Sequence, residues 1–341
     1  MPRVLVLQLK RIGDAILTAP ALASLRQALP EAHITLALDT AAWSLAPAFG
    51  MVDDHLRYAN GRAARDCWRA AMLRKFDTVL DFSGTDRSAG MALLSRAKVR
   101  AGYAKDLKNW LRKKTYTHVS DASVRELHTI DLHRALVATA MEASGLQPPP
   151  EVSDHGHLTL PPDLAPPALP SPYVVVHPGT ARAEKYWPAE RWKAVIQHLQ
   201  QQHQLPVVLT GSAAPEEIQH LSEIESDTNV QANFAGQLTL LQLASVISSA
   251  SLVLGVDSAA MHLAGAFQRP QIALYGPTNP FHWRPRHDRA LILTAGNPPD
   301  LPIQPRHPQH PMTDLPVAQV TAAVDCLLAG GETATNLREH L

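Results

Sequence analysis

The feature that most constrains the fold is an alternation of short apolar runs with longer segments of helical periodicity, on both sides of a proline-rich stretch. In the first half we expect strands at residues 4–9, 34–38 and 79–82, and helices at residues 13–29, 63–76, 86–97 and 127–144. Short, continuous apolar runs are typical of parallel strands buried on both faces. Their alternation with helices predicts a doubly wound parallel sheet.

The alternation restarts after a cluster of prolines in residues 147–172. Strands are expected at residues 173–177, 207–210, 252–256 and 272–275, and helices at residues 188–202, 215–225, 238–250 and 258–267. A last helix is expected to begin at a cap formed by Thr313 or Asp314, with apolar positions at Val317, Val320, Val324 and Leu327.

These segments predict an α/β protein of two Rossmann-like doubly wound domains facing a cleft. The expected division is an N-terminal domain at 1–150, a proline-rich linker at 151–172, a C-terminal domain at 173–315, and a C-terminal helix and tail at 316–341 that packs back toward the N-terminal domain. A chain of 341 residues is long enough for two cores. Proline suits a semi-rigid linker, although a long surface loop within one domain would have the same composition.

Composition excludes several classes of protein. Lys and Arg together number 31, as do Asp and Glu, so the formal net charge is zero and a general nucleic-acid binder is disfavoured. Two cysteines exclude a disulfide scaffold or a cysteine-rich zinc site and fit a reducing compartment. The chain opens directly on a strand pattern without a signal-peptide pattern, and no apolar run reaches the roughly 18 residues of a membrane span. We therefore predict a cytoplasmic protein that contacts membranes only at their surface.

The turn after the first expected strand carries Arg11, Ile12, Gly13 and Asp14. In an open α/β sheet, ligands bind outside the carboxyl ends of the strands. Gly13 favours a tight turn, and Asp14 can direct its carboxylate to the ligand. The alternative is an acid that complements the dipole of the helix N-terminus.

Two motifs after strands of the second half are suited to phosphate. Gly179 and Thr180 offer backbone and a hydroxyl, and Lys185 offers a mobile charge; a solvated lysine beside a structural tryptophan is the alternative. The segment Asp257, Ser258, Ala259, Ala260, Met261, His262 leads from a strand into a helix with small side chains at its start. Free N–H groups and the dipole at that N-terminus favour a diphosphate, whether or not Asp257 or Ser258 also caps the helix.

Two further features concern polar substrates. Glu216, after the second strand of this half, can accept hydrogen bonds from ribose hydroxyls, or it can be a solvated acid of the first helical turn. Residues 96–114 are rich in Lys and Arg with Asp106 as their only acid, which suits an anionic acceptor or an acidic membrane surface. A solvated face is the alternative.

Several motifs are missing from the sequence. There is no Gly-x-Gly fingerprint of a dinucleotide site, no Walker A loop and no Asp-x-Asp pair for a nucleotide-bound metal, and the 17 histidines are scattered. We therefore expect no cofactor and no metal site, and a nicotinamide oxidoreductase is disfavoured.

Taken in order, these motifs resemble the bacterial heptosyltransferase family, which transfers heptose from ADP-heptose to the lipopolysaccharide inner core. The resemblance extends over nearly the whole chain. It rests on residues 4–14 with 17–22, on 81–84 with Arg87 and Ser88, on 100–103, on 177–188, and on 255–264 continued by 275–278. Two departures are one extra residue between His177 and Lys185, and Ser-Ala-Ala after Asp257 where Thr-Gly is frequent.

The resemblance implies the two-domain GT-B fold, inversion at the anomeric carbon and no required metal. By motif match, Asp14 takes the position of the catalytic base, Lys185 lies near the donor phosphates, and Glu216 meets the ribose. The donor site further comprises Gly13, Gly179, Thr180, Asp257, Ser258, Ala259, Ala260 and His262. The anionic glycolipid acceptor is expected to contact Arg87, Lys105, Lys108, Arg112 and Lys113.

The resemblance thus implies ADP-heptose as donor, a glycolipid acceptor, no nucleic acid, and a cytoplasmic enzyme with room for peripheral contact at the inner face of the cytoplasmic membrane. A related transferase that modifies a protein or another glycan would share every motif. A catalytically silent sugar-nucleotide-binding protein on the same fold is the remaining alternative.

Overall fold

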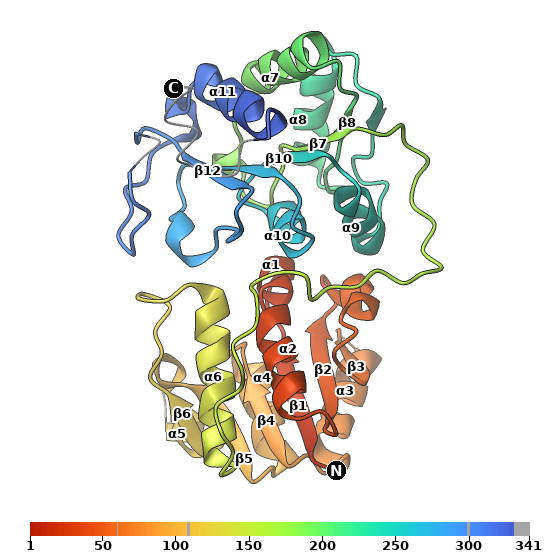
Figure 1. The fold of residues 1–341 in the computed structure, drawn as a ribbon. Coiled ribbons are helices and arrows are strands. Elements are labelled where there is room, and N and C mark those ends of the chain that lie inside the picture. Colours follow the sequence, from red (N-terminus) through yellow and green to blue (C-terminus); the bar gives the residue numbers. More distant parts are fainter. Residues whose placement is uncertain (60, 108–109, 299–300, 331–341) are drawn as a thin grey trace. The chain divides into compact units, whose positions relative to one another are not determined.

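The computed structural model describes residues 1–341 except 60, 108–109, 299–300 and 331–341. The chain divides into two compact units, Met1–Thr159 and Leu160–Leu341 (Figure 1). The boundary lies inside the expected linker. The part of that segment before the boundary is attached to the first unit, because the Arg134 guanidinium donates to the carbonyl oxygens of Val152 and Ser153.

The first unit is built on a parallel sheet of six strands in the order β3-β2-β1-β4-β5-β6. The strands are β1 (Arg3–Gln8), β2 (His33–Asp39), β3 (Asp54–Tyr58), β4 (Thr78–Asp81), β5 (Val99–Tyr103) and β6 (His118–Ser120). The helices are α1 (Ile12–Ile16), α2 (Ala19–Ala28), α3 (Arg62–Leu73), α4 (Asp86–Ser95), α5 (Trp110–Thr115) and α6 (Thr129–Ala143). Helix α2 packs with α6, and α4 packs with α3 and α5, so helices form two layers around the sheet (Figure 1).

The first expected helix is divided into α1 and α2, with a break at Leu17 and Thr18. Pro20 has no N–H, so a continuous helix would leave the Ile16 carbonyl without its donor four residues ahead. At the break, the Thr18 hydroxyl donates to the Asp14 carbonyl oxygen at 2.8 Å. The break therefore ends α1 just after Asp14.

The second unit repeats the topology with the strand order β12-β11-β10-β7-β8-β9, also parallel throughout. Its strands are β7 (Val174–His177), β8 (Val207–Leu209), β9 (Ala232–Asn233), β10 (Leu252–Val256), β11 (Gln271–Tyr275) and β12 (Ala290–Thr294). Its helices are α7 (Ala189–Gln202), α8 (Pro215–Glu225), α9 (Leu240–Ser248), α10 (Ala259–Ala266) and α11 (Val317–Leu328). Both sheets have the strand order of dinucleotide-binding folds, which confirms the expected pair of doubly wound units.

Two expectations for the last helix were wrong. Helix α11 packs on α7, β11 and β12 of its own unit, because its buried face (Val320, Ala323, Val324, Leu327) belongs to the second hydrophobic core. Its N-cap is Pro316, which makes no side-chain cap hydrogen bond, whereas Thr313 and Asp314 lie in the preceding 3₁₀ turn. Among the described residues, no helix is both long and apolar enough to cross a membrane.

Candidate active site

In the second unit, an ion pair joins two of the expected donor residues. The Lys185 ammonium lies 2.6 Å from Asp257 Oδ2, and the Thr278 hydroxyl donates to the same oxygen at 2.9 Å. Both charged side chains are nearly buried, with 11% of each exposed. Lys185 follows β7 and Asp257 follows β10, and these strands are neighbours in the sheet. Strand pairing therefore brings together two motifs that are distant in the sequence.

The N-terminus of α10 lies directly after Asp257. Ser258 is the N-cap, but its side chain makes no cap hydrogen bond, and its buried Oγ finds no partner among the described residues. Buried polar atoms are nearly always hydrogen-bonded, so this hydroxyl requires a partner such as water or a ligand. Ala259 and Ala260 begin the helix, and His262 is buried within it. Tyr275, at the end of β11, has its pKa raised well above the ordinary value by burial and by the nearby charge of Asp257.

At the end of β7, His177 lies close to the buried acid Glu217. His177 Nδ1 lies 2.9 Å from the Thr210 hydroxyl, and its Nε2 lies 3.9 Å from Glu217 Oε1. Burial lowers the pKa of His177, while the charge of Glu217 opposes this effect. A Cβ on Gly179 would lie only 2.1 Å from Glu217 Oε1, so any larger residue here would require the Glu217 side chain to move. Thr180 is half-buried beside it.

The two adjacent acids of α8 differ in environment. Glu216, the expected ribose contact, is exposed, whereas Glu217 is buried and accepts hydrogen bonds from the backbone N–H and the hydroxyl of Ser212. The sequence analysis did not single out Glu217. Helical spacing could have found it, because the buried positions Glu217, His220, Leu221 and Ile224 follow the pattern i, i+3, i+4, i+7.

In the first unit, Asp14 occupies the third position of α1, with Gly13 before it. Its backbone carbonyl accepts hydrogen bonds from Thr18 Oγ1 and from Gln8 Nε2, the latter at 3.4 Å. Its half-buried carboxylate accepts no hydrogen bond from the described residues. The backbone of Asp14 is thus held by two hydrogen bonds that leave its carboxylate uninvolved.

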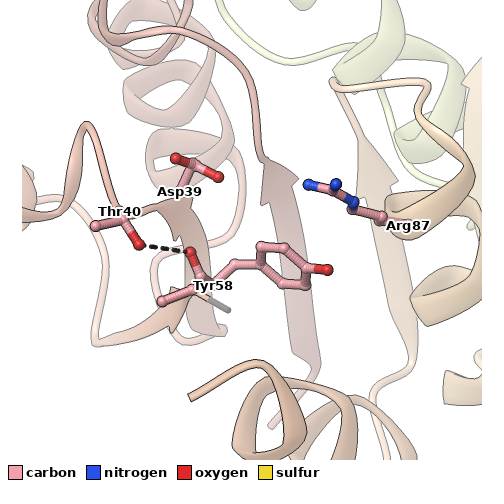
Figure 2. Close-up of a pocket in the computed structure, with 5 residues that line it drawn as sticks. Asp39, Thr40, Tyr58 and Arg87 are labelled. Atoms are coloured by element: carbon pink, nitrogen blue, oxygen red, sulfur yellow. Dashed lines mark hydrogen bonds between the residues drawn. The ribbon is translucent and has the colours of Figure 1, made fainter. Parts of the chain in front are cut away.

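A pocket of about 390 Å³ lies at the carboxyl ends of β2 and β3. It is lined by Asp39, Thr40, Tyr58, Ala59 and Arg87. Figure 2 shows the Asp39 carboxylate, the Tyr58 ring and the Arg87 guanidinium around this space. Arg87 was expected to contact the acceptor. The other lining residues were missed, although Asp39 ends the buried strand β2 and Thr40 follows it, where ligands of such folds bind.

The described cations of the basic run lie in different environments. Arg112 is nearly buried: its guanidinium donates to the carbonyl oxygens of Gly84 and Asp106 and pairs with Asp86. These contacts hold the loops around Arg112 together, and the expected contact of Arg112 with the acceptor stays a prediction. Lys105 is exposed and lies 5.2 Å from the centre of the Tyr103 ring, and Lys113 is exposed on α5. Lys108 lies outside the described residues.

Comparison with known proteins identifies the family. The model of glycosyltransferase family 9 (heptosyltransferase) matches residues 65–307. Lipopolysaccharide heptosyltransferase 3 of Escherichia coli is 27% identical over 344 residues, which cover 95% of this chain and 99% of that protein. The structure of ADP-heptose LPS heptosyltransferase II of E. coli has the same fold, with a TM-score of 0.78 at 20% identity, over 97% of this chain and 100% of that chain. An E. coli heptosyltransferase solved with ADP gives a TM-score of 0.74 at 21% identity, over 96% and 99% of the two chains. The chain therefore belongs to glycosyltransferase family 9, as its motifs suggested, and is a glycosyltransferase of the heptosyltransferase type.

Proposed function

We propose that this enzyme transfers heptose from ADP-heptose to an acceptor of the lipopolysaccharide inner core, with inversion and without a metal ion. The donor is supported by relatives: E. coli heptosyltransferases have been solved with ADP and with ADP-2-deoxy-2-fluoro heptose. The acceptor is supported by the name of the E. coli relative that matches 95% of the chain.

The observation that carries the proposal is the Lys185–Asp257 pair beside the α10 N-terminus. The Lys185 ammonium has three N–H donors, and two of them donate to the carboxylate and to the carbonyl oxygen of Asp257. A further N–H remains for a phosphate oxygen, together with the free N–H groups of α10 and the Ser258 hydroxyl. Asp257 holds the lysine in place and accepts hydrogen bonds from sugar hydroxyls. Gly179, Thr180 and Glu216 belong to the same proposed donor site.

The acceptor is assigned to the first unit. An inner-core glycolipid has hydroxyls and negative charges, which match the carboxylate and guanidinium of the Asp39–Arg87 pocket and the exposed Lys105 and Lys113. The same lysines would favour peripheral contact with anionic lipid at the inner face of the cytoplasmic membrane.

The reaction is a single displacement. Asp14 takes the proton of the acceptor hydroxyl while the hydroxyl oxygen forms a bond to the anomeric carbon. The bond from that carbon to the phosphate oxygen breaks, and its electron pair leaves with ADP. Negative charge grows on the leaving diphosphate, where Lys185 and the aligned N–H groups stabilise it without reorganisation.

The donor site is tested by calorimetric titration with ADP. Wild type should bind ADP with the same affinity in the presence and absence of EDTA. Lys185→Gln should lose about 1.5–3 kcal/mol of binding free energy, the usual contribution of a charged hydrogen bond. Lys193→Gln is the matched control, because Lys193 is similarly buried but pairs with Glu190 and Asp227. A large loss of ADP affinity on chelation would contradict metal-free binding.

The base is tested with Asp14→Asn, which keeps the shape of the side chain and removes its charge. A positioned base contributes roughly 10²–10⁴-fold to such a step, so turnover should fall by about that factor while ADP affinity is retained. Wild-type turnover in the variant would mean that Asp14 only complements the dipole at the helix N-terminus. A wild-type protein that binds ADP-heptose but never releases ADP would instead be a silent binding protein, and turnover only with a protein acceptor would favour a protein-modifying transferase.

A further inference from the structure

Three metal-ligating side chains meet on the second unit, where α7 and α11 lie against each other (Figure 1). His198 lies in the last turns of α7, His203 is its C-cap, and Asp325 projects from α11. Asp325 Oδ1 lies 2.7 Å from His198 Nε2 and 2.6 Å from His203 Nε2. The ligand atoms of all three residues lie within 4.8 Å of one another.

We propose that His198, His203 and Asp325 form a binding site for a divalent transition-metal ion of the zinc class. Two imidazoles and one carboxylate suit zinc and its neighbours, whereas calcium and magnesium prefer sites made only of oxygen. Zinc binds imidazole nitrogen at about 2.0–2.1 Å, so tetrahedral ligand atoms lie roughly 3.3 Å apart. Asp325 Oδ1 therefore needs to move less than about 1 Å from each imidazole nitrogen to admit the ion.

The surroundings allow this movement. The side chains of both histidines are 23% exposed and that of Asp325 is 48% exposed, so an ion can enter and keep water as its fourth ligand.

The site is remote from the donor residues. His203 lies a few residues before the start of β8, so it lies at the amino edge of the sheet, whereas Lys185 and Asp257 follow the carboxyl ends of strands. The ion would link the C-terminal helix to α7 and stabilise their packing. This site is independent of the proposed reaction, so EDTA should reduce stability without changing ADP affinity.

The test is titration of the metal-stripped full chain with zinc chloride, together with the visible absorption spectrum of bound Co²⁺. Wild type should bind one tight equivalent, show the d–d bands of a low-symmetry cobalt site, and unfold at a higher temperature with zinc than with EDTA. His198→Gln/His203→Gln and, separately, Asp325→Asn should weaken this equivalent by more than about tenfold. His118→Gln is the control, because His118 lies on β6 of the first unit and the variant removes one of the many other histidines.

Retained ADP binding shows that each variant is folded. No tight equivalent in wild type would overturn the proposal. The same would follow if the double variant bound zinc as wild type and the control do, since the ion would then bind other histidines.

Discussion

At the scale of single residues, we expect His133 to make a pH-dependent contribution to stability. Its ring lies fully buried against Phe82, and its Nδ1 lies 3.3 Å from the Leu17 carbonyl oxygen, at the break that follows Asp14. Burial, with the charge of Lys10, lowers the pKa of His133 from 6.5 to about 3. Between about pH 3 and pH 6.5, His133 is therefore neutral in the native state and protonated in the unfolded chain.

Protons then favour the unfolded state below pH 6.5, so the free energy of unfolding falls as pH falls. Between pH 7 and pH 5 this group accounts for a loss of about 2 kcal/mol. In urea titrations at the two pH values, His133→Gln should show a smaller loss than wild type by about that amount, because the other histidines contribute equally to both. An equal loss in the two proteins would mean that His133 titrates in the native state as it does when unfolded.

At the scale of elements, α5 carries two cations in different environments, the nearly buried Arg112 and the exposed Lys113. Arg112→Gln would leave the carbonyl oxygens of Gly84 and Asp106 without their donor, which should cost about 1–3 kcal/mol of unfolding free energy. Lys113→Gln should leave stability within about 0.5 kcal/mol of wild type. It should instead lower kcat/KM for the acceptor and weaken the salt dependence of that constant.

Chemical unfolding and acceptor kinetics over a range of salt concentration separate the two effects. If Lys113→Gln leaves acceptor kinetics unchanged at low salt, the exposed part of the run is only a solvated face. If Arg112→Gln is as stable as wild type, its hydrogen bonds are replaced by water.

At the scale of the whole molecule, the proposed division of substrates predicts where ADP slows hydrogen exchange. Mass spectrometry should find protection in the turns after β7, β10 and β11, which carry Lys185, Asp257 and Thr278. The turns of the first unit that line the Asp39–Arg87 pocket should exchange at an unchanged rate. Protection centred on the first unit would contradict the proposed binding of the nucleotide to the second unit.

The sequence determined the architecture because the inner strands are buried on both faces. Strands such as β1, β7 and β10 must be continuous apolar runs, and the helices between them must have helical periodicity. Motifs that follow such strands necessarily lie at one edge of a sheet, which is why Asp14, Lys185 and Asp257 could be proposed as ligand-binding residues from the sequence. Five strands were missed: β3, β5, β6, β9 and β12. Partly exposed residues leave no continuous apolar pattern in β3, β6 and β9, and Arg100 and Gly102 interrupt the apolar run of β5.

Only the tertiary structure decided which side chains meet. The order of strands in a sheet differs from their order in the chain, and this order pairs Lys185 with Asp257. The packing of α11 on α7 brings Asp325 to His198 and His203. The roles of Arg112 and Glu217 depend in the same way on partners from other turns of the chain. Local sequence sets periodicity, burial and turns, whereas a contact between distant residues depends on the packing of the whole unit.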